Sequence, residues 1–262
     1  MMMYEICAQT DPGRVRNNNE DALAFDAQTG LCILADGMGG YKAGEIASGM
    51  AVAGISLELG RWLSQPGRQV TVRELRKTME VCVGNANYSV FKSACFNPDY
   101  EGMGTTLVVG VFLEDRLVLG HIGDSRCYRL RGQTFQQITK DHSLLQEQID
   151  AGLITPEQAW SAPNKNLITR ALGVEDAVLL EINEHRVELG DIYMMCSDGL
   201  SDLVRDAIMS AILGGSETLP QKAVQLVAAA NESGGIDNIS VVLVHVTQDP
   251  GKRGLLLRML GK

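Results

Sequence analysis

The chain contains two apolar runs that each end in Asp-Gly, LCILADG at residues 31–37 and IYMMCSDG at residues 192–199. Short apolar runs rich in β-forming residue types are typical of buried strands, so we expect each aspartate where a strand ends and the chain turns. Carboxylates that meet at a partly buried site repel one another and take up protons unless a positive charge lies between them. The two runs therefore predict a site for a divalent metal ion.

The composition is that of an ordinary globular protein. The chain has 262 residues, 45% of them hydrophobic and 21% charged, which corresponds to roughly one to two domains. No apolar stretch approaches the roughly 20 residues of a membrane-spanning helix, and the first residues do not resemble a signal peptide. We therefore expect a cytoplasmic protein. The net charge of -9 argues against a nucleic-acid partner, because such binding depends on clusters of Lys and Arg.

Strands and helices are expected in neighbouring groups. The strands are predicted at 4–9, 22–36, 105–113, 116–122, 127–131, 134–138, 178–187, 192–196 and 239–246. The helices are predicted at 43–63, 71–92, about 201–213 and 219–232. This order favours an α+β fold in which antiparallel sheets pack together beneath helix pairs. A doubly wound sheet is the alternative, but no Gly-x-Gly-x-x-Gly motif between a strand and a helix supports it.

We expect one domain over residues 1–250. Within it, residues 143–173 are polar and helix-forming, and Thr155, Pro156 and Gln158 form a helix start signal. This flap is either an ordinary surface connection or a lid on the substrate side. The tail at 251–262 is both basic and apolar, which leaves a docked helix, a frayed end, partner binding and contact with a membrane surface as alternatives.

Further carboxylates lie beside the predicted strands and turns. They occur in RNNNED at residues 16–21, GDSR at 123–126 and GGIDN at 234–238. Carboxylates, backbone carbonyls and water select hard cations such as Mg²⁺ and Mn²⁺, whereas zinc favours His or Cys. Two such ions can share one bridging aspartate and generate a hydroxide between them.

Seven short motifs follow one another along the chain. They are RNNNED at residues 16–21, ADGMGG at 35–40, GMGTT at 102–106, GDSR at 123–126, DHS at 141–143, SDG at 197–199 and DN at 237–238. Each is weak alone, because Asp-Gly is usually only a turn, but their order is specific. The set resembles the metal-dependent PPM/PP2C family of Ser/Thr protein phosphatases in its bacterial form. The resemblance covers about residues 4–247 and implies a four-layer αββα sandwich.

The resemblance also implies which residues bind metal. Asp36 would bridge two ions, and the backbone carbonyl of Gly37 would bind the second ion. Asp198 and Asp237 would complete the site of the first ion, and Asp21 would assist through bound water.

Four further positions receive roles from the same resemblance. Glu20 and Asn238 would support the metal ligands from behind, and Asp124 would hold a third, weaker ion together with Asp198. Arg16 would bind the substrate phosphate, which suits a guanidinium because its fork can hold two phosphate oxygens at once.

The implied activity is hydrolysis of phosphoserine and phosphothreonine in proteins, with Mn²⁺ or Mg²⁺ as cofactor. A bridging metal hydroxide would attack phosphorus in line, without a covalent intermediate. Met38 stands where many eukaryotic relatives carry a His, so the general acid is not identified, and a metal-bound water is our candidate. Ala162 and Lys165 depart from the His-Pro-x-Arg-Asn flap motif common in bacterial relatives.

The expected partners are phosphorylated proteins, in particular a Ser/Thr kinase and its targets, and the expected oligomeric state is a monomer. Two other classes of function stay open. A catalytically dead module of the same fold would have lost a metal aspartate, and none is lost. A two-metal phosphoesterase for nucleotides or small phosphates is the third class, which the acidic charge and the missing base-binding motif disfavour.

Three polar residues near the motifs are expected to be structural. His121 and His142 lie beside acidic turns, where a single His is more often hydrogen-bonded than catalytic. Asp141, His142 and Ser143 are consecutive, so their side chains cannot converge as a catalytic triad. Arg126 is predicted to form an ion pair.

Overall fold

The computed structural model describes residues 2–40, 43–67, 70–160, 162 and 167–248. The strands are β1 (Met2–Asp11), β2 (Asp21–Asp26), β3 (Leu31–Met38), β4 (Gly104–Thr105), β5 (Leu107–Leu113), β6 (Arg116–Ile122), β7 (Arg126–Arg131), β8 (Thr134–Gln137), β9 (Glu181–Arg186), β10 (Ile192–Cys196) and β11 (Ile239–Gln248). The helices are α1 (Ala43–Leu63), α2 (Val72–Phe96), the 3₁₀ helix η1 (Pro98–Tyr100), α3 (Leu144–Asp150), α4 (Pro156–Trp160), α5 (Asp198–Ser201), α6 (Asp206–Gly214) and α7 (Leu219–Glu232).

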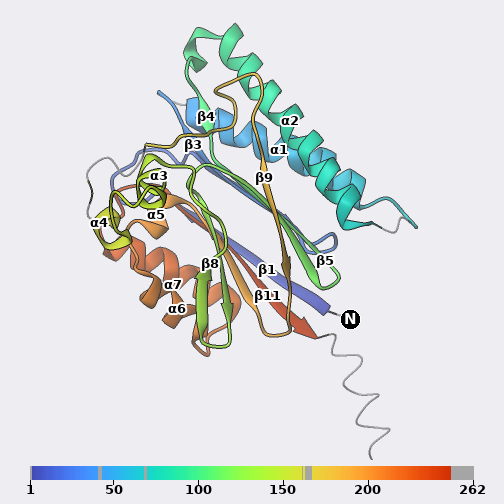
Figure 1. The fold of residues 1–262 in the computed structure, drawn as a ribbon, viewed down its shortest axis with the longest axis vertical. Coiled ribbons are helices and arrows are strands. Elements are labelled where there is room, and N and C mark those ends of the chain that lie inside the picture. The colour runs from blue at the N-terminus through green and yellow to red at the C-terminus, as the bar shows by residue number, and fades with distance from the viewer. Residues whose placement is uncertain (1, 41–42, 68–69, 161, 163–166, 249–262) are drawn as a thin grey trace, which may run out of the picture.

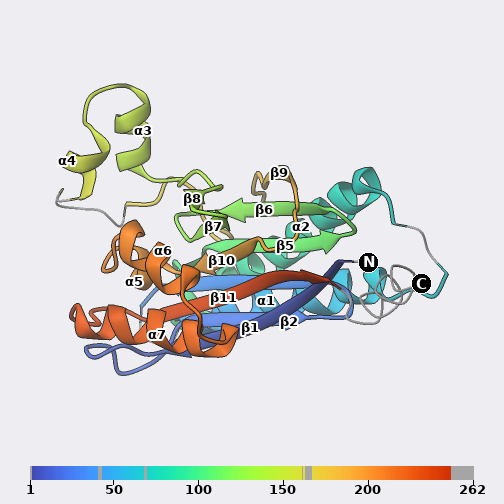
Figure 2. The same cartoon turned by 90° about the horizontal axis from the view of Figure 1, so that it is seen from below.

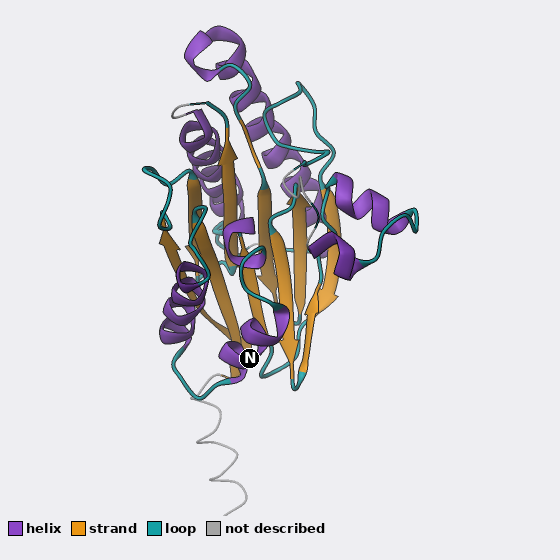
Figure 3. Ribbon diagram, turned by 90° about the vertical axis from the view of Figure 1, so that its left-hand side faces the viewer, coloured by secondary structure: helices purple, strands orange, loops and turns teal. Residues whose placement is uncertain are grey.

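Two antiparallel sheets lie face to face in the middle of the molecule. One has the strand order β1-β11-β10-β7-β8, and the other has the order β2-β3-β5-β6-β9 with β4 paired to β3. Figure 1 shows α1 and α2 on one side of the strands and α6 and α7 on the other, and Figure 3 shows the strands enclosed between helices. The predicted αββα sandwich is confirmed.

The apolar run LCILADG at residues 31–37 becomes β3, which contributes to two cores. Leu31, Ile33 and Ala35 pack with α1 and α2, whereas Cys32 and Leu34 face the other sheet. Successive side chains of a strand point to opposite faces, so a strand buried on both sides needs a continuous apolar run. This requirement explains why the run shows no polar alternation.

The second run becomes β10 and has the same two-sided character. Met194 and Cys196 pack with α5, α6 and α7, and Tyr193 and Met195 fill the space between the sheets. The two Asp-Gly runs therefore lie in different sheets, each between a helical layer and the shared central core.

Some predicted boundaries were wrong. The stretch expected at 22–36 is a hairpin, because the Asp26 carboxylate accepts hydrogen bonds from the Gln28 amide at 2.9 Å and the Thr29 hydroxyl at 2.8 Å and closes a turn. The helix expected at 201–213 is divided into α5 and α6, because Arg205 is in an extended conformation. The strand expected from 178 begins only at Glu181.

The flap contains the short helices α3 and α4, which Figure 2 shows on the same side of the molecule as α5 and α6. The predicted helix start is present, because the Gln158 amide donates to the Thr155 hydroxyl at 3.3 Å and the Thr155 amide donates to the Gln158 side chain at 2.8 Å. The two ends of the flap are joined where Ser143 pairs with Ile168. Lys165 and the tail at 251–262 lie outside the described residues, so the predictions for them stay predictions.

None of the helices in the described part of the chain is long and apolar enough to cross a membrane.

A buried ion pair joins β7 to the start of β10. The Asp191 carboxylate is 1% exposed and accepts hydrogen bonds from Arg131 at 2.8 and 2.7 Å and from the Glu188 amide at 2.9 Å. Burial opposes ionisation of this carboxyl, but the hydrogen bonds from Arg131 outweigh burial and lower its pKa. Its stabilising effect is therefore present at neutral pH and is lost as the pH falls through that lowered pKa.

We expect Asp191→Asn to reduce the free energy of unfolding by roughly 2 kcal/mol, because it leaves the partly buried Arg131 without its counter-charge. Glu188→Gln is the matched control, since Glu188 binds the same guanidinium at 2.7 Å but is 53% exposed. Urea denaturation at pH 7 measures both variants. Equal urea midpoints for the two variants would show that burial of the Arg131–Asp191 pair adds nothing to the free energy of unfolding.

Candidate active site

Most of the sequence-predicted residues meet around one cavity of about 200 Å³. Its walls contain eight of them, namely Arg16, Glu20, Asp36, Gly37, Asp124, Asp198, Asp237 and Asn238. The ninth, Asp21, lies directly opposite Asp36 in the β2–β3 register. The cavity therefore collects carboxylates from the ends of β3 and β6, from the start of α5 and from the turn before β11.

A chain of hydrogen bonds fixes Asp36 relative to the loop of Asp124. The Asp36 amide donates to the Thr106 hydroxyl at 3.0 Å, and the Thr106 amide donates to the Asp36 carbonyl at 2.9 Å. The same Thr106 hydroxyl lies 2.7 Å from the hydroxyl of Ser125, which follows Asp124 directly. Thr106 was interpreted from the sequence only as the start of a strand, so its linking role was missed.

Asn238 holds the RNNNED loop in place. Its side-chain oxygen accepts from the Glu20 amide at 2.8 Å, and its side-chain nitrogen donates to the carbonyls of Asn18 at 2.8 Å and Pro12 at 3.1 Å. The loop that carries Arg16 is thereby fixed beside Asp237, the residue that precedes Asn238.

Arg16 lies at the mouth of the cavity. Its guanidinium donates to the Asp237 carboxylate at 2.8 Å, and its side chain is 52% exposed. This hydrogen bond raises the pKa of Arg16, so the side chain carries its positive charge at every working pH. An exposed cation at the mouth is accessible to an anionic substrate.

Asp21 is supported from β10. The Ser197 hydroxyl donates to one oxygen of the Asp21 carboxylate at 2.9 Å. The other oxygen, Oδ1, is buried and has no hydrogen-bond partner among the described residues. A buried carboxylate oxygen without a partner is costly, so this oxygen is suited to accept from a cation or an ordered water.

Both Asp-Gly pairs require glycine because the backbone packs closely behind the aspartate. A Cβ on Gly37 would collide with the carbonyl of Gly44 and lie 2.6 Å from the Glu20 carbonyl. A Cβ on Gly199 would collide with the Asn238 carbonyl. The glycines therefore allow each aspartate to approach the neighbouring loop.

The carboxylates repel one another strongly. Burial, followed by the charges of Asp21 and Asp198, raises the pKa of Asp36 well above its usual range. Burial and the charge of Asp124 do the same to the pKa of Asp198. Burial raises the pKa of Asp21 and of Asp124 to about 6 each. Because the donor set is made only of oxygens and its carboxylates repel one another, it fits hard divalent cations.

A second cluster of polar side chains lies outside this cavity. His121, His142 and Glu181 bring one nitrogen or oxygen each to within 4.8 Å of one another. Arg170 lies 3.1 Å from Nε2 of His142, which disfavours a cation there, and His121 Nε2 bonds the Lys140 carbonyl at 2.7 Å. The two imidazole rings stack with centroids 4.6 Å apart. Both histidines are hydrogen-bonded, as the sequence analysis predicted.

Arg126 forms the predicted ion pair. Its guanidinium binds the Asp141 carboxylate at 2.6, 2.9 and 3.1 Å. Asp141 is thus occupied by an arginine and does not act with His142 and Ser143 as a triad.

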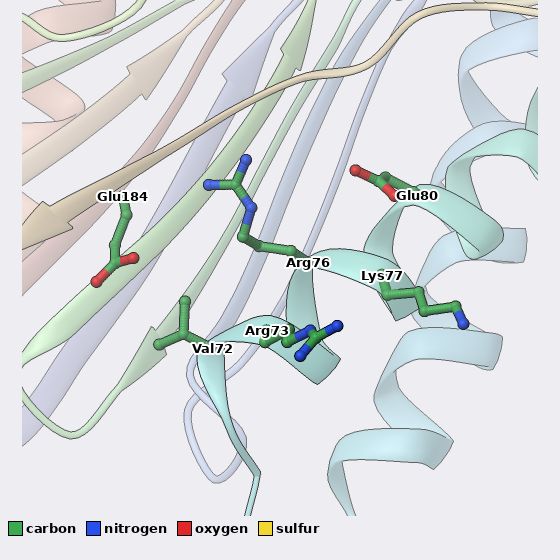
Figure 4. A pocket seen from close by; sticks show the side chains of 6 residues that line it. All are labelled: Val72, Arg73, Arg76, Lys77, Glu80 and Glu184. Atoms are coloured by element: carbon green, nitrogen blue, oxygen red, sulfur yellow. The ribbon is translucent and has the colours of Figure 1, made fainter.

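A larger hollow of about 620 Å³ lies at the beginning of α2. It is lined by Val72, Arg73, Arg76, Lys77, Glu80 and Glu184. In Figure 4, Arg73 and Lys77 point away from Glu184, and the charged groups do not converge on one point. This hollow therefore lacks the convergent donors of a catalytic site.

Comparison with known proteins identifies the family. A model of the family described as protein phosphatase 2C matches residues 13–227. The chain belongs to the protein phosphatase 2C family. It is 37% identical over 240 residues to the serine/threonine phosphatase stp of Listeria innocua, and the match covers 90% of this chain and 94% of that protein. It is 36% identical over 249 residues to the protein phosphatase PhpP of Streptococcus pneumoniae, with coverage of 94% and 98%. The resemblance drawn from the motifs is confirmed.

Solved structures of this phosphatase family share the fold. The serine/threonine phosphatase PstP of Mycobacterium tuberculosis has a TM-score of 0.86 and 39% identity, and the match covers 94% of this chain and 100% of that chain. A catalytic domain of PstP solved with 2 manganese ions has a TM-score of 0.83 and 38% identity, with coverage of 95% and 100%. The manganese ions belong to that protein's structure.

We expect Gly37→Ala to destabilise the protein by about 1 to 3 kcal/mol, because the added methyl group forces the β3 end away from the Glu20 and Gly44 carbonyls. Gly40→Ala is the control, since a Cβ at Gly40 meets no atom of the described residues within 4 Å. Thermal unfolding and phosphate release from a phosphothreonine peptide measure both variants. A Gly37→Ala protein as stable and active as Gly40→Ala would contradict the close approach.

Proposed function

We propose that the chain is a metal-dependent phosphatase that hydrolyses phosphoserine and phosphothreonine in proteins. The observation that carries this proposal is the convergence of mutually repelling aspartates, with raised pKa values, beside an exposed arginine. A site built in this way needs cations for its own stability and, once it holds them, attracts a phosphate dianion. The names of the relatives support the same activity.

The proposed ligand set follows the family pattern. Asp36 would bridge two Mn²⁺ or Mg²⁺ ions, with the Gly37 carbonyl on the second ion and Asp198 and Asp237 on the first. Asp21 would act through water. Its unpartnered Oδ1 supports this assignment because that atom is available as an acceptor.

A third, weaker ion would lie between Asp124 and Asp198. Both residues line the cavity, and the charge of Asp124 raises the pKa of Asp198. A cation between them would relieve this repulsion, which supports the proposal. Glu20 and Asn238 would hold the surrounding loops, as their hydrogen bonds indicate.

When bound, divalent ions activate water for attack on phosphorus and offset the charge of the phosphoryl group. Arg16 would hold two phosphate oxygens with its guanidinium fork while the alkoxide of serine or threonine departs. Its pairing with Asp237 orients the guanidinium toward the cavity. Thr106 and Asn238 keep the carboxylates in position during the reaction through their hydrogen bonds.

The departing alkoxide of serine or threonine needs a proton, and Met38 at the end of β3 does not supply it. Met38 lines the cavity, and its thioether has no proton to donate. We therefore propose water in the cavity as the general acid.

The family does not fix the partners in the cell. A Ser/Thr kinase and its targets, a monomeric state and a cytoplasmic location remain our proposals for this protein. The acidic net charge of -9 supports the exclusion of nucleic acid.

We expect Asp36→Asn to reduce phosphate release from a phosphothreonine peptide by about a hundredfold or more, because it removes the bridging charge. Activity of the parent protein should require added Mn²⁺ or Mg²⁺ and stop with chelator. In chelator, the variant should melt at the same temperature as the parent or higher, since the substitution also relieves repulsion among the carboxylates.

Asp26→Asn is the control for this experiment, because Asp26 lies at the other end of the same hairpin and its carboxylate accepts turn hydrogen bonds from Gln28 and Thr29. Calorimetric titration with Mn²⁺ gives a readout that does not depend on activity. Unchanged Mn²⁺ binding and turnover in Asp36→Asn would refute the proposed bridge.

We expect Arg16→Ala to raise KM for the phosphothreonine peptide by about tenfold or more, because a charge-assisted contact to phosphate is lost. Arg16→Lys should recover only part of this loss, since an ammonium lacks the planar fork. Arg14→Ala serves as control, because Arg14 does not line the cavity. The same KM in Arg16→Ala and Arg14→Ala would exclude Arg16 from phosphate binding.

A further inference from the structure

A groove of about 590 Å³ continues from the proposed metal site. It shares Asp124 and Asp198 with the smaller cavity, so the two spaces meet at the carboxylates. From there it passes between the flap helices α3 and α4 on one side and α5 and α6 on the other. Figure 2 shows these two pairs of helices facing each other. A substrate whose phosphate occupies the metal site has to extend part of its chain along this groove or out into solvent.

The groove has features suited to a peptide. Leu145, Ile149 and Ala159 supply apolar surface from the flap. Ser201, on the opposite wall, is 2% exposed, and its hydroxyl has no hydrogen-bond partner among the described residues. Since buried hydroxyls are almost always paired, this hydroxyl indicates that a polar group of a ligand or an ordered water completes the groove.

The charge of the groove is negative beyond the metal ligands. Apart from Asp124 and Asp198, four carboxylates and two guanidinium groups line it. The four are Asp141, Glu157, Asp202 and Asp206. Arg126 is already bound to Asp141 at 2.6 Å. Among the described residues that line the groove, Glu157, Asp202 and Asp206 are three further carboxylates beside one further guanidinium group, that of Arg205.

We infer that this groove selects phosphoproteins with a lysine or arginine close to the phosphorylated residue. The inference rests on the proposed phosphatase activity and adds a sequence preference to it. The phosphate would lie at Asp36 and Asp198, and the cationic side chain would lie beside Asp202, Asp206 and Glu157. Like charges are disfavoured in the same place, so an acidic flank would be rejected.

The position of the cation follows from the helix geometry. Asp202 is four residues beyond Asp198, about 6 Å along a helix. Asp206 begins α6, directly after the extended residue Arg205. An extended peptide covers about 3.3 Å per residue. A cationic residue roughly two to four positions from the phosphothreonine therefore reaches these carboxylates.

The test compares three phosphothreonine peptides that carry Arg, Ala or Glu at positions three before and three after the phosphorylated residue. We expect kcat/KM to be about five- to tenfold higher for the Arg peptide than for the Glu peptide, and to fall with added salt. In the double variant Asp206→Asn/Glu157→Gln the preference should shrink to about twofold or less, while the Ala peptide is hydrolysed as by the parent. The matched control is Asp176→Asn, an exposed carboxylate outside the groove, which should keep the full preference.

The outcomes separate the two proposals. If the parent protein with Mn²⁺ releases no phosphate from any of the three peptides or from a small aryl phosphate, the proposed function fails. If it hydrolyses the Ala peptide but treats the Arg and Glu peptides equally, the activity stands and the groove inference is wrong. A preference for Arg that survives in the double variant would also overturn the inference, because the selectivity would then come from another surface.

Discussion

Mutual repulsion among buried carboxylates is the constraint on which the rest of this structure depends. Asp36 and Asp198 are buried close enough to Asp21, Asp124 and Asp237 for each pKa to be raised by its neighbours. Such a cluster opposes folding unless rigid elements hold it together and a cation occupies it. The two sheets supply the rigidity, because β3 and β10 are each buried on both faces and have little freedom to move their ends apart.

The supporting contacts are made by neutral groups. Thr106, Ser197 and Asn238 hydrogen-bond to the carboxylate-bearing segments, and Thr106 also bonds to Ser125, which follows Asp124. Hydroxyl and amide groups can position a carboxylate or its loop without neutralising it, so the negative charge stays available for metal ions. Arg16 is the exception, and it lies at the exposed mouth, where a phosphate can take over its hydrogen bonds.

The sequence predicted those features that depend on local pattern. Continuous apolar runs identified β3 and β10, and the ordered acidic motifs identified the residues that meet at the cavity. It did not predict the break at Arg205, because apolar residues recur at helical spacing straight across it, and the extended residue has no signature of its own. These residues are Leu200, Val204, Ile208 and Ile212. The link from Thr106 to Ser125 was also missed, since it joins two loops 19 residues apart through side chains that look like ordinary strand residues.

The loop of Asp124 connects the catalytic cavity to the groove and to the flap. His142 accepts a hydrogen bond from the Gly123 amide at 3.1 Å and donates its own amide to the Gly123 carbonyl at 2.9 Å. The His142 carbonyl accepts from the Thr169 amide at 2.8 Å, at the far end of the flap. The base of the flap is therefore fixed to the loop that carries a proposed metal ligand.

Because of this connection, substitutions at the base of the flap and substitutions at its outer part would have different effects. Because its base is tied to the Asp124 loop, substitutions there would disturb the position of a carboxylate and so act on metal binding. Substitutions farther out, at the groove-lining face of α3 and α4, leave those hydrogen bonds intact. They would act instead on a substrate peptide that binds in the groove. A flap built in this way can change which phosphoproteins it admits without altering the chemistry that removes the phosphate.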